Sequence, residues 1–388
     1  MDTQDQDLIQ TLRHSTRAFV KRQLEPLEKQ VEEEDRFPEG LRQQMGNLGY
    51  FGLTIPEEYG GSGLSLSAYC AIVEEFGRTH SAFFSIIDDN NGMGSHMILH
   101  AGTEEQRKRY LPRIASGEAI SCFALTEPQA GSDASGILTT AIRDGAYYVL
   151  NGRKHFISNA GWAQYFNVIA GTAPIGSADR RISAFLVERD TPGFTVGRRE
   201  PMMGHRGSGH HELIFDNCCV PIENRLGEEG TGLKTAFKAL STGRLTVAAW
   251  SIGAADRALE MGINYARDRQ QFGKPIGTFQ GVQWLIADSA TELFAARSIL
   301  NEVAKAEEAG TARRRDSAMV KLFATETAGK VVDRMLQIHG GAGYARETGI
   351  ERIYRDVRVQ RIIEGTSEIQ RMLIAKSLLH EAGMVWND

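Results

Sequence analysis

Apolar residues recur at helical spacing near the start of the chain and again in its last third. Leu8, Leu12 and Phe19 lie four and seven residues apart, which places them on one face of a helix. In the last third, two series of apolar residues recur at every seventh position: Ile252, Leu259 and Ala266, and then Ile286, Leu293 and Leu300. Because spacings of seven keep side chains on one packed seam, this part is predicted to form a helical bundle.

The region from about residue 121 to 230 has a different pattern, with short β-prone runs separated by turn residues. The run at 147–150 lies between Asp144-Gly145 and Asn151-Gly152, two dipeptides that are strong hairpin signals. A second run at 182–187 is followed by a Thr-Pro-Gly turn. Strands at this density predict a small antiparallel barrel or sandwich.

The order of these patterns predicts an α+β multidomain fold. With 388 residues, the chain is longer than a single hydrophobic core usually serves. We expect an N-terminal α-helical domain at 1–120, a central small antiparallel β-barrel or sandwich at 121–230, and a C-terminal four-helix bundle at 231–388.

Composition narrows the classes of function. The chain is 41% hydrophobic and 24% charged, and its net charge of −5 gives no electrostatic reason to expect nucleic-acid binding. No apolar run reaches the ~18–20 residues that span a bilayer. The first five residues are polar and acidic, unlike a secretory signal. We therefore expect a cytoplasmic protein, or one of the mitochondrial matrix if a presequence has been removed.

Cysteine and histidine positions predict no redox or metal site. The four cysteines include no CxxC pair, which fits a reducing compartment. Neighbours in a strand point to opposite faces, so the adjacent Cys218 and Cys219 favour a structural role over a redox switch. His210 and His211 have no further ligand at a plausible spacing, so no metal is predicted.

The segment at 361–370 holds the strongest candidate for acid–base chemistry. Ser367 and Gln370 have the spacing of a capping box, which predicts a helix beginning just after Ser367. Glu364 therefore lies in a tight loop, after Ile362 and Ile363 and before a glycine. A carboxylate among apolar neighbours loses hydration, which raises its pKa toward the range of a general base. Taken alone, the segment also fits a surface glutamate in a loop.

Two glycine-containing segments add candidate ligand contacts. Residues 337–344 follow a helical pattern and no βαβ unit surrounds them, so they are a poor match to a Rossmann fingerprint. Their glycines fit a helix end that comes close to a ligand. Residues 124–136 combine hydroxyl groups with glycines, a composition that can present backbone N–H groups to a phosphate or a flavin ring. This second segment also fits an ordinary polar loop.

Together these segments resemble the acyl-CoA dehydrogenase family. The first family signature is similar to the stretch that contains Leu125-Thr126-Glu127, Gly131-Ser132-Asp133 and Gly136. The second matches at every spacing, at Gln337, Gly340, Gly341, Gly343, Tyr344, Glu347, Arg352 and Asp356. The α-β-α order and the length also agree, so the resemblance spans essentially the whole chain.

The resemblance implies FAD bound between the β domain and the C-terminal bundle. The residues implied to contact FAD within one chain are Phe123, Leu125, Thr126, Gly131, Ser132, Phe156, Ile157, Ser158, Thr366, Ser367 and Glu368. Thr126 and Ser132 are the implied hydrogen-bond partners. Many members carry Trp at the position of Phe156, and a phenylalanine still stacks there with less contact area. A role for Phe156 as a core aromatic stays open.

A second set of residues is implied to reach FAD across a subunit interface. It comprises Arg269, Gln271, Phe272, Phe279, Gln280, Gln337, Gly340 and Gly341. Arg269 would face the pyrophosphate, where a guanidinium makes paired hydrogen bonds. Such sharing implies an obligatory dimer, and the resemblance implies a homotetramer built as a dimer of dimers. The implied protein partner is an electron-transfer flavoprotein.

By resemblance, the reaction is the α,β-dehydrogenation of an acyl-CoA thioester to the 2-enoyl-CoA. Glu364 would take the α-proton while hydride passes from the β-carbon to flavin N5. The backbone N–H of Glu364 and a ribityl hydroxyl would stabilise the developing enolate charge. Some members place the base on an earlier helix, at the position that Gly243 occupies here. Since glycine cannot act as a base, the resemblance selects Glu364.

The resemblance implies substrate contacts at Ser132, Arg244, Asp89, Ile363 and Gly365. Arg244 matches an arginine near the pantetheine arm, although a helix-surface charge stays open for it. A serine at 241 replaces a frequent aspartate, which leaves room for a carrier-protein thioester in place of acyl-CoA.

The acyl group is less well specified. The polar run at 88–91 falls where the family builds the floor of the acyl pocket. These residues either cap a helix or face the pocket, and the second arrangement would favour a short or polar acyl group. Phe84 stands where glutaryl-type members carry an arginine, which argues against a glutaryl substrate.

Two rival functions are a flavin monooxygenase or oxidase on the same fold, and a non-catalytic assembly protein. Monooxygenases and oxidases of this fold often lack the catalytic glutamate. A non-catalytic protein would be expected to have lost Glu364 or the FAD loop. Neither is lost here, so a dehydrogenase is the preferred hypothesis.

Overall fold

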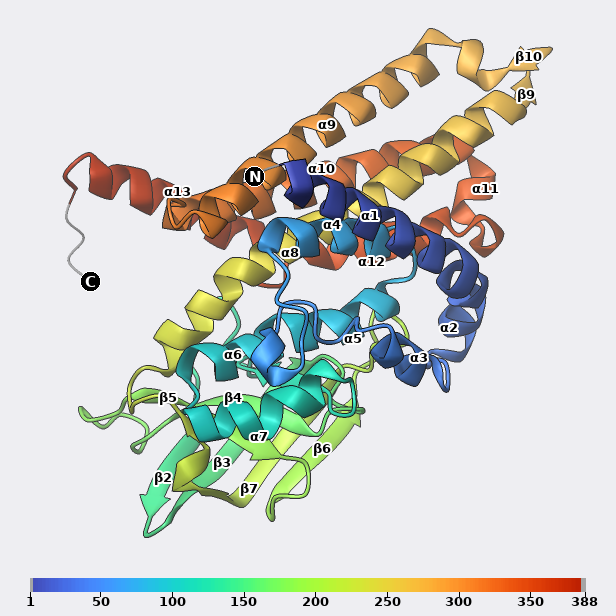
Figure 1. Cartoon of the computed structure of the whole chain (residues 1–388). Helices are drawn as coiled ribbons and strands as arrows, with labels where there is room; N and C mark the ends of the chain where they lie inside the picture. The colour runs from blue at the N-terminus through green and yellow to red at the C-terminus, as the bar shows by residue number, and fades with distance from the viewer. Residues whose placement is uncertain (1–2, 385–388) are drawn as a thin grey trace.

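The computed structural model describes residues 3–384, which fold as helices, then a β domain, then long helices (Figure 1). The predicted α+β class and the α-β-α order are confirmed. Met1 and Asp2, the start of the acidic segment that argued against a secretory signal, lie outside the described residues.

The N-terminal part is a set of short helices packed around α4 and α5. They are α1 (Thr3–Phe19), the π-helix η1 (Val20–Leu24), η2 (Glu25–Leu27), α2 (Glu28–Glu34), α3 (Leu41–Asn47), η3 (Glu57–Tyr59), α4 (Leu66–Gly77), α5 (Ser81–Asn91), α6 (Met93–Ala101) and α7 (Glu104–Ala115). A capping box of Thr103 and Gln106 begins α7, which explains its sharp start. Leu12 and Phe19 pack against the core as predicted, whereas Leu8 is 51% exposed.

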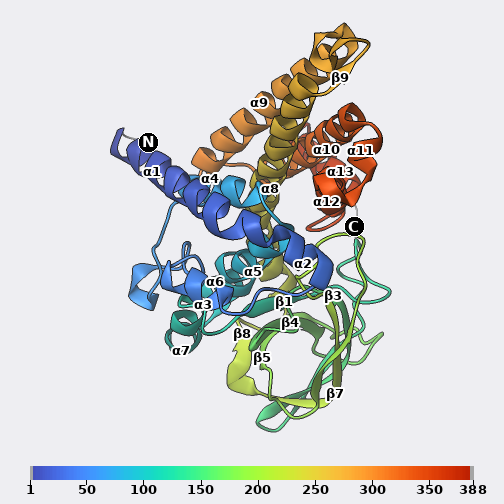
Figure 2. The same ribbon diagram turned by 90° about the vertical axis from the view of Figure 1, so that its right-hand side faces the viewer.

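The β domain is one eight-stranded sheet that curls into a barrel-like layer (Figure 2). Its strands are β1 (Ser121–Ala124), β2 (Thr140–Asp144), β3 (Tyr147–Ile157), β4 (Tyr165–Gly171), β5 (Ile182–Glu188), β6 (Phe194–Arg199), β7 (His211–Pro221) and β8 (Arg225–Leu226). The order is β6-β7-β3-β2-β4-β5-β8, with β1 beside β4. Pairing is mainly antiparallel, as predicted, and is parallel where β4 meets β1 and β2. All seven residues of β4 are buried, so this strand forms the centre of the domain.

One of the two predicted hairpin turns is correct. Asp144 and Gly145 lead from β2 into β3, and Gly145 has a φ of 55°. The prediction at Asn151-Gly152 is wrong, because that dipeptide lies inside β3 at an irregularity in the pairing with β7. A Cβ at Gly152 would lie 2.6 Å from Thr139 Oγ1, so the glycine allows a close approach and not a turn.

Helices return after the β domain. They are α8 (Gly232–Asp268), η5 (Ile276–Thr278), α9 (Gln280–Glu308), α10 (Arg314–His339), α11 (Gly341–Tyr344), η6 (Arg346–Thr348), α12 (Ile350–Arg358), η7 (Val359–Arg361) and α13 (Ser367–Glu381). The short strands β9 (Gln270–Gln271) and β10 (Lys274–Pro275) join α8 to α9 at a tip that extends away from the β domain (Figure 2). The predicted seams are buried, apart from Ile286, which packs at the edge of the core.

The remaining sequence expectations are local. Cys218 is buried and Cys219 exposed, as expected for neighbours in a strand. Between residues 3 and 384, no helix is long and apolar enough to cross a membrane.

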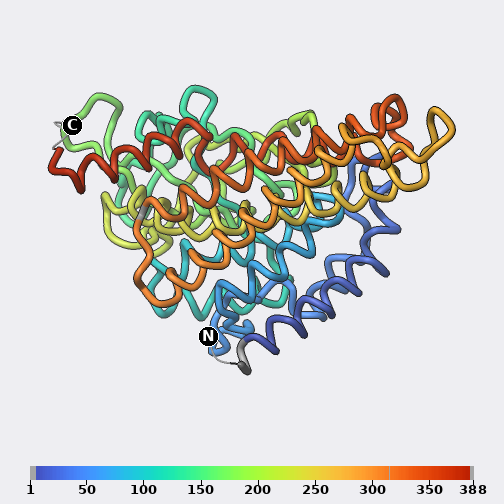
Figure 3. The backbone as a smooth tube through the Cα atoms, turned by 90° about the horizontal axis from the view of Figure 1, so that it is seen from above, coloured from blue at the N-terminus to red at the C-terminus, as the bar shows by residue number. Residues whose placement is uncertain are grey.

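Seen from above, α1 runs along one side of the molecule and α13 along the opposite side (Figure 3). Helix α8 contacts α4, α6 and α10, and also strands β4 and β5, so it connects all three parts of the chain.

Candidate active site

A cleft of about 250 Å³ opens where the β domain meets α5, α8 and the loop before α13. It is lined by Glu364, by all five predicted substrate contacts, and by the eight β-domain residues that were predicted to contact FAD. These are Asp89, Ser132, Arg244, Ile363 and Gly365, and Phe123, Leu125, Thr126, Gly131, Ser132, Phe156, Ile157 and Ser158. Residues separated by more than 270 positions in the sequence therefore share one cleft.

The loop that carries Glu364 adopts a strained backbone. Glu364 has a φ of 52° and Gly365 a φ of 93°, both in the left-handed region. For a residue other than glycine, this conformation costs about 1–3 kcal/mol and persists only where surrounding contacts hold it. Gln370 Nε2 donates to the carbonyl oxygens of Glu364, at 3.1 Å, and Gly365, at 2.9 Å. Lys321 Nζ donates to the same Gly365 oxygen at 2.8 Å.

The predicted helix start is wrong by one residue. Thr366 is the N-cap of α13, with its side chain accepting from the backbone N–H of Ile369 at 3.3 Å, and Ser367 is the first helical residue. The predicted capping box does not form, because the Gln370 amide points to the loop carbonyls. Ser367 Oγ donates instead to Glu326 Oε1 at 2.6 Å.

The Glu364 carboxyl is the least compensated acid of the cleft. Its Oε2 atom is buried and has no hydrogen-bond partner among the described residues. Burial and the negative charge of Asp88 raise the pKa of Glu364 to about 8, against the opposing charges of Lys321 and Arg244. The direction agrees with the sequence argument, but the cause differs. Ile362 and Ile363 are 50% and 37% exposed, so helices from elsewhere in the chain bury the carboxyl.

Helix α8 approaches Glu364 at Gly243. A Cβ built on Gly243 would lie 2.4 Å from Glu364 Oε2, well inside van der Waals contact. The two alternative positions for a base therefore face the same space. In this chain the absence of a side chain at Gly243 is what makes room for the carboxyl of Glu364.

The end of α5 contributes two acids to this region. Asp88 accepts a hydrogen bond from the Tyr69 hydroxyl at 3.0 Å, and burial raises the pKa of Asp88 to about 6. Asp89 lines the cleft and accepts from Asn159 Nδ2 at 2.6 Å, and burial raises its pKa to about 8.

The polar run at 88–91 thus divides between two roles. Asn90 and Asn91 are fully buried and donate to backbone carbonyls of neighbouring segments, including those of Ala119 and Tyr50. These two side chains hold the fold together. Only Asp89 of the four lines the cleft, so the alternative in which the run faces the pocket holds for this one acid.

Sequence reasoning missed a buried ion pair behind the loop at 125–139. Lys154 Nζ donates to Glu127 Oε1 at 2.6 Å and to the Leu125 carbonyl at 3.0 Å. The Glu127 carboxylate in turn accepts from the backbone N–H groups of Leu138, at 2.6 Å, and Thr139, at 3.1 Å. Both side chains are almost fully buried. The pair therefore fixes the loop that brings the hydroxyl groups of the first signature to the cleft.

The β-domain side of the cleft fits a flat aromatic ring. Phe123 and Leu125 supply apolar walls, while Thr126 and Ser158 supply hydroxyl groups. Phe156 is 48% exposed and has a φ of 59°, so the fold holds an aromatic side chain at the cleft in a strained backbone conformation. Its exposure removes the alternative that Phe156 is a core aromatic, and an exposed ring at a cleft suits stacking on a ligand.

The second predicted set of FAD contacts lies outside this cleft. Arg269, Gln271, Phe272, Phe279 and Gln280 surround the β9–β10 tip, at the far end of α8 from the β domain (Figure 2). Gln337, Gly340 and Gly341 lie where α10 ends and α11 begins. Phe272 is 92% exposed. One chain does not bring these residues to its own cleft, and their role toward a neighbouring subunit stays a prediction.

Three further predicted residues follow Glu364 closely. Thr366 and Ser367 form the start of α13, and Glu368 is exposed in its first turn.

Arg244 is 7% exposed, so it is not a helix-surface charge. Within residues 3–384, no group of three or more His, Cys, Asp or Glu side chains is placed to hold a metal ion.

Comparison with known proteins identifies relatives along the whole length. Family models described as the N-terminal, middle and C-terminal domains of acyl-CoA dehydrogenase match residues 6–118, 122–218 and 230–379. An acyl-CoA dehydrogenase of Bacillus subtilis is 42% identical over 368 residues, which cover 95% of this chain and 97% of the relative. The caffeyl-CoA reductase-Etf complex subunit CarC of Acetobacterium woodii is 40% identical, over 95% of this chain and 97% of its own.

A solved structure agrees with these sequence relatives. The acyl-CoA dehydrogenase of Bacillus anthracis, complexed with FAD, superimposes with a TM-score of 0.90 at 34% identity. The match covers 99% of this chain and 68% of the other.

Proposed function

The chain belongs to the acyl-CoA dehydrogenase family, and we propose that Glu364 is the base with which it removes the α-proton of an acyl-CoA thioester. The protein is an FAD-dependent oxidoreductase that converts the thioester to its 2-enoyl form. The observation that carries the assignment is the Glu364 carboxyl itself. Its Oε2 atom is buried without a hydrogen-bond partner among residues 3–384, in a cleft whose other wall suits a flat ring.

The residues of the cleft fit FAD, which a similar solved structure contains. Phe123, Phe156 and Ile157 would pack against the ring system, and the hydroxyl groups of Thr126 and Ser132 would hydrogen-bond to it. When bound, FAD supplies the acceptor for the hydride that leaves the β-carbon. The Lys154–Glu127 pair keeps the loop with these hydroxyl groups in place before any ligand arrives.

The protein's own part in the reaction is to hold and take up one proton. A carboxylate with a pKa raised to about 8 is a stronger base than an ordinary glutamate, so it accepts a carbon-bound proton at a smaller cost. The strained loop orients the carboxyl toward the cleft, and the apolar Ile363 and Ile369 help to exclude water. The backbone N–H of Glu364 is proposed to polarise the thioester carbonyl.

Arg244 is proposed to contact the pantetheine arm of CoA. The proposal is supported by its position, because Arg244 is buried in α8 and lines the cleft. Ser241, one turn earlier, has its Oγ 3.3 Å from Ser317 Oγ. The family's frequent aspartate is thus replaced by a neutral pair of hydroxyl groups, which keeps a carrier-protein thioester as an alternative to CoA.

The acyl pocket is proposed to take a short or polar acyl group. Asp89 lines the cleft that also contains Glu364, and a polar floor solvates an alkyl chain poorly. Phe84 is buried and stacks against Trp250, with ring centroids 6.0 Å apart, so this position supplies no cation for a distal carboxylate. Anaerobic bleaching of the flavin by straight, branched, aromatic and hydroxylated acyl-CoAs would rank these substrates.

Further expectations concern partners. An electron-transfer flavoprotein is the proposed electron acceptor, in line with a relative that is a subunit of an Etf complex. A homotetramer, built as a dimer of dimers, is proposed because the exposed β9–β10 tip carries residues that would complete FAD binding in a neighbour. A cytoplasmic location is proposed as well.

Glu364→Gln is the direct test of the base. The variant keeps the shape of the side chain and removes its basicity, so we expect normal binding of FAD and acyl-CoA. Anaerobic flavin bleaching should slow by at least ~10²–10⁴-fold. Near-normal bleaching would contradict the assignment. A purified protein unable to bind FAD would argue against the enzyme itself, and rapid oxygen consumption during turnover would favour an oxidase.

A further inference from the structure

Lys321 is a buried cation beside the loop of the proposed base. It lies in α10 and is 0% exposed, and its Nζ donates to the carbonyl oxygen of Gly365, the residue after Glu364. Burying an ammonium group costs several kcal/mol unless charge or hydrogen bonds offset it. The hydrogen bond that Nζ forms goes to a neutral carbonyl oxygen and not to a carboxylate, so a structural ion pair does not explain the position of Lys321.

The charges around the two residues show what Lys321 faces. Lys321 interacts with Glu364 across the loop, with Arg244 of α8, with Glu326 of its own helix and with Glu368 of α13. Burial lowers the pKa of Lys321 to about 8, and the charge of Glu364 opposes this most strongly. Glu364 in turn faces two acids of α5, Asp88 and Asp89, and two cations, Lys321 and Arg244.

Lys321 is not the only residue that donates a hydrogen bond to the Gly365 carbonyl. Gln370 Nε2 donates to the same Gly365 oxygen at 2.9 Å and to the Glu364 oxygen at 3.1 Å. A neutral side chain at position 321 would therefore leave the loop carbonyls partnered. What Lys321 adds to the neutral amide of Gln370 is a positive charge next to the base.

We propose that Lys321 is a positioning residue: its hydrogen bond to Gly365 fixes its ammonium group beside the Glu364 loop, where its charge stabilises the carboxylate form of Glu364. The inference rests on the proposed role of Glu364 as the base. Two buried acids favour the protonated glutamate, which cannot take a proton from the substrate. Lys321 and Arg244 offset them, and Lys321 is the one anchored to the loop itself.

The test compares the pH dependence of anaerobic flavin reduction by butyryl-CoA in Lys321→Met, Lys321→Gln and Lys321→Arg. Reduction requires ionised Glu364, so its rate rises with pH through the pKa of that group. Loss of the cation should move this rise upward by about one pH unit or more in Lys321→Met. Below the midpoint, reduction should be about tenfold slower than in the natural protein.

The two other variants separate charge from hydrogen bonding. Lys321→Gln keeps a donor near Gly365 without the charge and should behave as Lys321→Met does. Lys321→Arg keeps the charge and should restore most of the original midpoint. An unshifted midpoint in both neutral variants, with the rate lowered equally at every pH, would overturn the proposal. So would a natural pH profile in Lys321→Gln alone, because the hydrogen bond would then be sufficient.

A second readout needs no turnover. A diazo compound esterifies only protonated carboxyl groups, so the pH dependence of Glu364 labelling, followed by peptide mass spectrometry, reports its protonation directly. In Lys321→Met, labelling of Glu364 should persist to higher pH than in the natural protein. In Asp89→Asn it should end at lower pH, because the charge of Asp89 raises the pKa of Glu364. Identical labelling curves in the natural protein and Lys321→Met would refute the inference.

Failure of this inference can be told apart from failure of the base assignment. If Glu364→Gln still bleaches the flavin at a near-normal rate, Glu364 is not the base and both proposals fail. If Glu364→Gln is inactive while the neutral variants at 321 keep the natural midpoint and labelling curve, only the role of Lys321 fails.

Discussion

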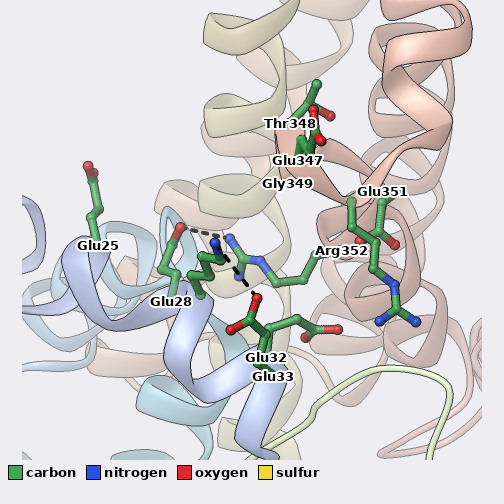
Figure 4. Close-up of a pocket in the computed structure, with 11 residues that line it drawn as sticks. Glu25, Glu28, Glu32, Glu33, Glu347, Thr348, Gly349, Glu351 and Arg352 are labelled. Atoms are coloured by element: carbon green, nitrogen blue, oxygen red, sulfur yellow. Dashed lines mark ion pairs between the residues drawn. The ribbon is translucent and has the colours of Figure 1, made fainter.

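Two charged regions of this molecule contain the same kinds of side chain and use them differently. One is the cleft around Glu364. The other is a groove between α2 and α12, of about 470 Å³, whose walls are mostly glutamates and arginines (Figure 4). The groove is larger than the cleft, so size does not identify the active site. The state of the carboxyl groups does.

In the groove, most of the acids form ion pairs with cations. Arg352 Nη2 lies 3.0 Å from Glu28 Oε2, a contact drawn in Figure 4. Next to it, Arg355 contacts Glu32 at 2.7 Å and Glu351 at 2.7 Å. Burial raises the pKa of Glu32, but its hydrogen bond with His80 and the charge of Arg355 outweigh burial, so the pKa ends below its usual value.

In the cleft, burial and neighbouring acids outweigh the cations that act on the carboxyl group. Glu364 has two cations near it, but also two buried acids and no hydrogen bond to Oε2 among the described residues. Its pKa rises to about 8. Pairing fixes the α2–α12 contact and leaves its carboxylates inert, whereas incomplete pairing leaves Glu364 able to take up a proton. Four variants would break or sharpen this contrast.

Gly243→Ala should have the largest effect. The added methyl group would lie 2.4 Å from Glu364 Oε2 and must displace the carboxyl. A misplacement of about 1 Å costs on the order of 100-fold in rate, so flavin reduction by butyryl-CoA should slow by that factor while FAD stays bound. Gly281→Ala is the matched control, because nothing lies within 4 Å of a Cβ there. A natural rate in Gly243→Ala would show that the carboxyl can work from elsewhere.

Arg355→Met should destabilise the protein without altering its chemistry. Removing the guanidinium takes from the partly buried Glu351 its ion pair and leaves Glu32 with His80 and the more distant Arg206, which should lower the free energy of unfolding by about 2–3 kcal/mol. Denaturant unfolding measures this. Lys29→Met, at an exposed pair of the same groove, should change stability by about 0.5 kcal/mol or less. A shifted pH midpoint of flavin reduction in Arg355→Met would contradict the separation of the two regions.

Asp89→Leu should change substrate preference. An apolar side chain at the floor of the cleft favours an alkyl group over a hydroxylated one, by about tenfold in the ratio of kcat/KM. Butyryl-CoA and 4-hydroxybutyryl-CoA provide the comparison. Asp88→Asn is the control, because Asp88 does not line the cleft and its charge acts on Glu364, which changes the rates of both substrates alike. An unchanged ratio in Asp89→Leu would place the distal end of the acyl group away from Asp89.

The smallest effect concerns stability against pH. A carboxyl with a folded-state pKa raised to about 8 destabilises the fold progressively as pH rises from its unfolded value of about 4.5 through 8. Glu364→Gln removes this loss, so its Tm should exceed that of the natural protein by about 1–3 °C near pH 9 and match it near pH 5. Glu32, with a lowered pKa, acts in the opposite sense: its contribution is present above the unfolded pKa and is lost as pH falls through the folded one. An equal Tm difference at both pH values would exclude this linkage.

Much of the fold was predictable because the signals are local. Seven-residue spacing depends only on helix geometry, so the buried seams of α8 and α9 follow from the sequence. Asp144-Gly145 forms its hairpin because the turn needs only its own residues. Asn151-Gly152 carries the same signal but lies inside β3, where pairing with β7 outweighs local turn preference. The N-cap at Thr366 was missed by one residue, because the loop contacts of Gln370 prevent the capping box.

The sequence by itself determined the family, the α-β-α order and a short set of candidate residues that includes Glu364 and Gly243. These depend on motifs and periodicities that can be read along the chain. Only the tertiary structure decided that a Cβ at Gly243 would meet the Glu364 carboxyl, that Asp89 and not Asn90 lines the cleft, and that Lys321 reaches Gly365. A carboxyl's pKa depends on burial and on charges from α5, α8 and α10, and no pattern along one segment contains those distances.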